Sequence, residues 1–288
     1  MPTDPIQLAL AAFEIGLLLF GVILLGWLAF STSFRARWWH VNRLPHWSVA
    51  LAEFALYLLA LFTGGFLFQS LVRILFGKFI ADSTDRAGME VIFYGAGLDG
   101  GALIGWLFFP LLRRAWHTDY GVKPPEDIPA LPSPGWGKSV LYGVGTVALS
   151  LPIIVILSLG WTSILRAFGL PDDPQDSITI FSNTKSPIVV AGMLFVACVF
   201  APIMEELLFR AGLYRFCRQK FGRASALIIT GLLFGAVHGN WAGFLPLAFL
   251  GAMLAMVYET TGSIRVAIIA HAFFNLNSIL AILSGLKM

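Results

Sequence analysis

The sequence PIVVAGMLFVACVFAPIMEELLFRAGLY, residues 187–214, decides what kind of protein this is. A helix of about 20 apolar residues crosses the hydrocarbon core of a bilayer, and this run is long enough. Its ionisable residues are Glu205, Glu206 and Arg210. Each such group costs roughly 2.5–3.5 kcal/mol on membrane insertion and is usually retained for a function in a protein interior or wet cavity. The stretch therefore predicts a membrane helix that carries a functional polar cluster.

The composition extends this prediction to the whole chain of 288 residues. Hydrophobic residues make up 58% and charged residues 12%, with a mean hydropathy of +0.81, whereas soluble domains have about 25% charged residues. Continuous apolar runs favour helices, because strands of a membrane barrel would alternate. We expect an all-α fold, a polytopic membrane bundle of about eight transmembrane helices forming one membrane domain over 1–288. The expected spans are 6–30, 48–76, 90–112, 139–167, 187–214, 224–239, 241–260 and 264–285.

The basic residues indicate membrane topology. The net charge is +3 and the pI about 9.0, but the Lys and Arg residues fall between the apolar runs, so we expect a lipid bilayer and no nucleic acid as partner. The odd-numbered loops are the basic ones, which predicts that they are cytoplasmic and that both termini face outward. We expect a multi-pass protein, in the plasma (inner) membrane if the source is prokaryotic. The basic loop residues are Arg35, Arg37, Arg43, Arg113, Arg114, Lys123, Lys138, Arg215, Arg218, Lys220 and Arg223.

The third expected span contains small residues at a regular spacing. Gly97, Gly101 and Gly105 are four apart, which lets two membrane helices approach closely. Asp99 lies among them, either as a buried polar contact or in an aqueous mouth. Glu14 and Glu53 are lone acids, which we interpret as snorkelling or paired carboxylates.

The segment 172–186 is polar and interrupted by proline. We expect an external loop there, with a short surface helix around 178–181.

The acidic cluster has a defined arrangement if its segment is an α-helix. Glu206 and Arg210 are four residues apart, so they share a face and can pair. Glu205 is rotated by about 100° from Glu206 and points in a neighbouring direction. A desolvated carboxylate there is a usable general base; a structural ion pair beside a stray acid is the alternative.

Two further polar clusters lie in the following spans. Phe234 and His238 are four residues apart, as are His271 and Asn275, so each pair shares a helix face. The second pair could stabilise a developing oxyanion. Taken singly, these residues suit a structural histidine and interhelical hydrogen bonding. Three clusters in neighbouring helices instead favour a set of groups for hydrolysis.

Other hydrolytic chemistries are less consistent with the sequence. It contains no His-Glu-x-x-His zinc motif and no Gly-x-Ser-x-Gly nucleophile elbow. Zinc held by Glu205, His238 and His271 stays open as a three-ligand site.

These three motifs, in this order, resemble the CAAX-processing and bacteriocin-processing (CPBP) family of intramembrane endopeptidases, which includes Ras-converting CAAX endopeptidases. The family's Glu-Glu-x-x-x-Arg, Phe-x-x-x-His and His-x-x-x-Asn match Glu205-Glu206-Arg210, Phe234-His238 and His271-Asn275. The match covers roughly 187–285, the expected catalytic core, and about the first 135 residues carry no such motif.

The resemblance implies a glutamate-type endopeptidase that hydrolyses a peptide bond with an activated water. Glu205 would be the general base, helped by His238, while His271 and Asn275 stabilise the oxyanion. Glu206 and Arg210 would position these groups. It implies a protein or peptide substrate, lipidated or not, and no cofactor, with zinc as the alternative. A non-enzymatic scaffold or immunity protein on the same fold is the second hypothesis. A transporter fits less well, because the polar residues cluster in the C-terminal half.

Overall fold

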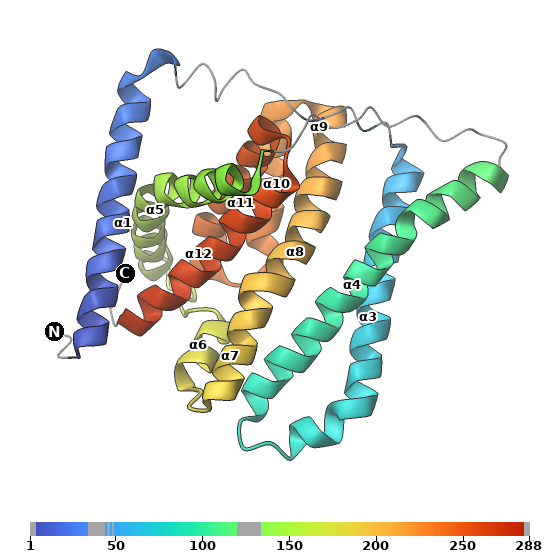
Figure 1. Cartoon of the computed structure of the whole chain (residues 1–288), viewed down its shortest axis with the longest axis horizontal. Helices are drawn as coiled ribbons and strands as arrows, with labels where there is room; N and C mark the ends of the chain where they lie inside the picture. The colour runs from blue at the N-terminus through green and yellow to red at the C-terminus, as the bar shows by residue number, and fades with distance from the viewer. Residues whose placement is uncertain (1–3, 34–43, 45–46, 48, 120–133, 285–288) are drawn as a thin grey trace. The chain divides into compact units, whose positions relative to one another are not determined.

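The computed structural model describes residues 4–33, 44, 47, 49–119 and 134–284, and this part of the chain is helical with no strand. Seven of its helical stretches are long and apolar enough to cross a membrane. The predicted helical membrane fold is confirmed, and the protein is a multi-pass integral membrane protein. These stretches are α1 (Pro5–Phe30), α3 (Leu51–Ala81), α4 (Arg86–Asp119), α5 (Trp136–Ala167), the composite helix Pro187–Phe221, α11 (Trp241–Thr261) and α12 (Ile264–Ser284) (Figure 1).

The expected span 224–239 is a shorter helix than the others. It corresponds to α10 (Arg223–Val237), which has 15 residues, against about 20 for a full crossing. Gly239, with φ of +62°, separates it from α11. A second short helix, α6 (Asp176–Asn183), confirms the helix predicted around 178–181.

The described residues form two compact units. Unit 1 contains α1, α5 and α10–α12, and unit 2 contains α3, α4 and the helices from α6 to α9 (Arg215–Phe221). The single membrane domain over 1–288 and the membrane topology stay predictions. Arg35, Arg37, Arg43 and Lys123, four of the basic residues used for topology, lie outside the described residues.

The hairpin of α3 and α4 in unit 2 is packed through small residues, as predicted (Figure 1). A Cβ added at Gly101 would lie 2.3 Å from the Gly64 carbonyl oxygen, and one at Gly105 would lie 2.0 Å from that of Ala60. Either substitution would force the two backbones apart. The predicted close helix approach is therefore confirmed.

Buried acids are matched by polar partners in both units. Glu53 in α3 accepts a hydrogen bond from Arg113 Nε of α4 at 2.8 Å, so the paired interpretation is confirmed for this acid. In unit 1, Glu259 pairs with Arg223 Nε at 2.9 Å. Glu14 is 4% exposed and interacts with the Asn277 side chain. Such partners reduce the cost of burying a charge.

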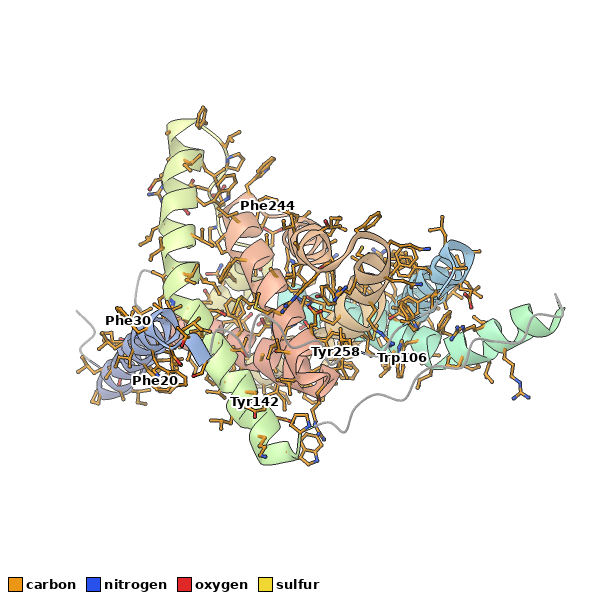
Figure 2. The ribbon with its side chains drawn as sticks, turned by 90° about the horizontal axis from the view of Figure 1, so that it is seen from above. Phe20, Phe30, Trp106, Tyr142, Phe244 and Tyr258 are labelled. Atoms are coloured by element: carbon orange, nitrogen blue, oxygen red, sulfur yellow. The ribbon has the colours of Figure 1, made fainter. Side chains whose placement is uncertain are left out.

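Large apolar side chains cover much of the outside of α1. Phe20 and Phe30, labelled in Figure 2, are 48% and 90% exposed. A helix that is apolar on its exposed faces suits contact with lipid, which agrees with the membrane assignment.

Candidate active site

The helix that carries the predicted acids changes geometry along its length. It begins as α7 (Pro187–Phe195), continues as the π segment η1 (Val196–Phe200), and returns to α geometry in α8 (Ala201–Glu206). A second π segment, η2 (Leu207–Tyr214), follows directly. Segments of π-helix occur frequently at functional sites, and here they lie on both sides of Glu205 and Glu206.

Close packing against α4 holds the start of this helix within unit 2. Added Cβ atoms at Gly88 and Gly192 would lie 2.4 Å from a Val189 methyl and 2.6 Å from an Ile92 methyl, respectively. Gly88 contacts Val189, and Ile92, one turn later in α4, contacts Gly192. Because residue numbers increase together along the two helices, α4 and α7 run in the same direction (Figure 1).

Glu206 and Arg210 form the ion pair that their spacing predicted. Arg210 Nη1 donates to Glu206 Oε1 at 2.8 Å, and the two residues are 1% and 0% exposed. Glu206 is the last residue of α8, whereas Arg210 lies within η2, so the pair connects the α segment to the π segment. Removing either partner would leave a charge in a buried site.

Glu205 occupies a different environment from Glu206. It is half-buried, as expected from the rotation between adjacent residues of an α-helix. The charge of Arg210 acts on both acids. Asp99 of α4 lies close enough to Glu205 for their charges to interact. A third carboxyl group therefore accompanies the motif, which the sequence pattern did not reveal.

His238 is the C-cap of α10 in unit 1, and its ring is hydrogen-bonded to its own helix. Its Nδ1 lies 2.7 Å from the Phe234 carbonyl oxygen. A carbonyl only accepts hydrogen bonds, so Nδ1 carries a proton, and in the neutral ring Nε2 carries the lone pair. This arrangement suits a base or a metal ligand at Nε2.

Phe234 supports both predicted histidines. Its ring centroid lies 4.9 Å from that of His238 and 5.6 Å, edge-on, from that of His271. Phe234 is fully buried, and a Cβ added at Gly251 would meet its Cβ at 2.8 Å. The sequence predicted the shared face of Phe234 and His238 but gave no signal for the contact with His271.

His271 and Asn275 lie in the uninterrupted helix α12, so their four-residue spacing places them on one face, as predicted. His271 is 2% exposed and Asn275 is half-buried.

The six predicted residues divide between the two units. Glu205, Glu206 and Arg210 belong to unit 2, and His238, His271 and Asn275 to unit 1. The structure brings Glu206 together with Arg210, and both histidines onto Phe234. Joint action of the two groups, and the zinc set of Glu205, His238 and His271, stay predictions.

Comparison with known proteins gives two matches. Residues 187–277 match the family model "Type II CAAX prenyl endopeptidase Rce1-like". The chain is also similar to the "Putative membrane peptidase YdiL" of Bacillus subtilis (strain 168), with 31% identity over 141 residues, 48% of this chain and 54% of that protein. The chain thus spans about half the length of the curated relative that it matches. No solved structure gave a significant match.

The matched segment contains all three motifs, from Glu205 to Asn275. The resemblance that the sequence predicted, to the CAAX-processing and bacteriocin-processing family of membrane endopeptidases, is therefore confirmed.

Proposed function

We propose that this protein is an intramembrane endopeptidase that hydrolyses peptide bonds with a water molecule activated by Glu205. The observation that carries the proposal is the unequal environment of two adjacent acids. Glu206 is buried and paired with Arg210, whereas Glu205 is half-buried. The Glu206 carboxylate is thus fully buried in an ion pair, whereas the neighbouring residue Glu205 keeps part of its surface exposed.

In the proposed reaction, the Glu205 carboxylate accepts a proton from water as the water oxygen bonds to the substrate carbonyl carbon. The tetrahedral intermediate then collapses, the C–N bond breaks, and the leaving amine takes up a proton from the Glu205 carboxyl. His238 assists through Nε2, whose lone pair follows from the bond between Nδ1 and the Phe234 carbonyl. Atoms and charges balance with water as the co-reactant.

His271 and Asn275 are proposed as donors to the oxyanion of this intermediate. They share a face of α12, so their hydrogen bonds can converge on one oxygen atom. Such donors are effective because they are oriented before the charge develops.

We propose that this reaction proceeds without a metal ion. Arg210 interacts with both acids, and a divalent cation beside this guanidinium would be repelled. Asn275 accompanies His271, and a pair of donors suits an oxyanion better than a metal shell. A zinc-dependent reaction through Glu205, His238 and His271 is the alternative that chelation tests.

The proposed substrate is a membrane-associated protein or peptide. The matched family model describes a prenyl endopeptidase, so peptides with a prenylated C-terminal Cys-a-a-X sequence should be tested beside the same peptides without the lipid.

The test is cleavage of this peptide set by purified protein in liposomes, with products identified by mass spectrometry. Glu205→Gln keeps the size of the side chain but cannot accept the proton, so cleavage should stop. Glu14→Gln is the matched control, since Glu14 is also a buried acid in a membrane helix, and it should leave cleavage unchanged. Full activity of a folded Glu205→Gln variant would refute the assignment.

A further inference from the structure

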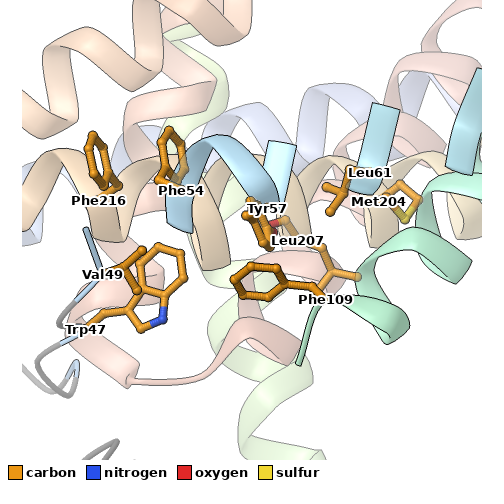
Figure 3. Packing of buried hydrophobic residues seen from close by; sticks show 9 residues of the cluster. All are labelled: Trp47, Val49, Phe54, Tyr57, Leu61, Phe109, Met204, Leu207 and Phe216. Carbon is orange, nitrogen blue, oxygen red and sulfur yellow. The ribbon is translucent and has the colours of Figure 1, made fainter. Parts of the chain in front are cut away.

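A tyrosine from a distant part of the sequence contacts the segment that carries the Glu206–Arg210 pair. The hydroxyl of Tyr57 in α3 donates to the carbonyl oxygen of Leu207 at 2.6 Å. Leu207 is the first residue of η2 and directly follows Glu206. Figure 3 shows the two side by side within unit 2.

The Tyr57 side chain is fixed by an aromatic cluster. It is 2% exposed, and its ring lies edge-on to Phe109 at 5.1 Å and to Trp47 at 6.0 Å. Phe54 stacks on it at 6.1 Å. A buried phenol needs a hydrogen-bond partner, and here the partner is the backbone of the π segment. The hydroxyl is therefore held in one place before any substrate binds.

The same ring touches η2 at a second point. A Cβ added at Gly212 would lie 2.4 Å from Tyr57 Cε1 and 3.0 Å from its hydroxyl oxygen, so only glycine lets the ring lie this close to the backbone. Leu207 and Gly212 are on either side of Arg210 in sequence. Tyr57 thus contacts the π segment before and after the residue that pairs with Glu206.

We propose that Tyr57 is a positioning residue of the hydrolytic site. Its two contacts hold η2 in the π geometry in which Arg210 reaches Glu206, and this pair in turn fixes the direction of the adjacent Glu205. The proposal rests on the proposed function of Glu205. It assigns Tyr57 no contact with substrate, so its loss should lower turnover and leave substrate affinity unchanged.

The test compares Tyr57→Phe with Tyr94→Phe. Tyr57→Phe removes the hydroxyl and keeps the ring, so kcat should fall about 10-fold while KM stays within about 2-fold, because small displacements of catalytic groups cost large factors in rate. Tyr94→Phe is the matched control: it also removes one phenol hydroxyl from unit 2, at a residue of α4 that lies against Arg73 and is not part of the cluster around Tyr57. It should leave both kcat and KM unchanged.

A second readout does not need activity. Amide hydrogen exchange in detergent should become faster in 207–214 of Tyr57→Phe and stay unchanged there in Tyr94→Phe, since exchange reports local opening. Unchanged kcat or unchanged exchange in Tyr57→Phe would overturn the proposal. If the wild-type protein cleaves no peptide, the proposed function fails, and exchange alone decides whether Tyr57 holds the segment: faster exchange supports it and unchanged exchange overturns it.

Discussion

The polar side chains of the acidic motif and those of the histidine motifs are stabilised by different interactions. In unit 2 a full charge is buried beside an opposite charge, within a helix that contains two π segments. In unit 1 the rings of His238 and His271 pack against the buried ring of Phe234, and His238 is hydrogen-bonded to a backbone carbonyl. The first arrangement depends on charge compensation, and the second depends on packing against an aromatic ring.

This difference predicts how each region responds to mutation. Breaking a buried ion pair leaves an uncompensated charge and affects stability. Truncating a side chain that packs on a ring and forms no buried ion pair should mainly affect the chemistry that the side chain performs. Activity and stability should therefore separate in unit 1 and remain coupled for the ion pair in unit 2.

The largest expected effect separates the two adjacent acids. Glu205→Gln should lower kcat by about 10²–10⁴-fold, the range for a general base, at an unchanged Tm. Glu206→Gln should lower Tm as well, because it removes the negative partner of buried Arg210. Peptide cleavage and thermal melts of both variants provide the measurement. Equal Tm losses for the two would show that the acids have equivalent roles.

Arg210→Ala should have the next largest effect. It should lower the free energy of unfolding by about 3–5 kcal/mol, since Glu206 would remain as a buried, uncompensated carboxylate. Arg210→Lys should restore little of this, because an ammonium group lacks the planar fork of guanidinium. Denaturation and purification yield would be compared with those of Arg166→Ala, which removes an exposed pair with Asp172. A wild-type melt for Arg210→Ala would contradict the role given to charge compensation.

His271→Ala and Asn275→Ala should each lower kcat by about 10²–10³-fold, the loss typical of one oxyanion donor. KM should change little, and for Asn275, which is half-buried, Tm should also be preserved. Steady-state kinetics on the cleaved peptide would show this. A rise in KM at unchanged kcat would instead assign the residue to substrate binding.

The smallest expected effect is that of metal removal. Exhaustive chelation should leave activity unchanged, and elemental analysis should find no stoichiometric metal, if Glu205 activates water without zinc. Activity that disappears with chelator and returns with zinc would establish the zinc-dependent alternative.

Local patterns predicted much of the fold and the pairing within each motif. Apolar runs gave most helix positions, and the i, i+4 spacing gave the contact between Glu206 and Arg210. Arg210 lies in a π segment, and no residue pattern in 187–214 predicted this change in backbone hydrogen bonding.

Contacts between distant segments could not be predicted, because they depend on which helices become neighbours. Tyr57 and Leu207 are 150 residues apart in the sequence, and the ion pair of Glu53 with Arg113 joins α3 to α4. One signal was present: a tyrosine inside an apolar helix needs a partner for its hydroxyl. Nothing in the sequence indicated which partner.

The turn after α10 has a consequence for depth in the bilayer. A helix of 15 residues covers about 22 Å, less than the roughly 30 Å of hydrocarbon. Backbone groups at such depth have no water and must bond to protein. Asn240 meets this requirement, because its side chain accepts from the Gly243 amide at 2.7 Å and donates to the Asp173 carbonyl at 2.9 Å. The turn beside His238 thus satisfies backbone groups within the protein, as a turn inside the bilayer would require.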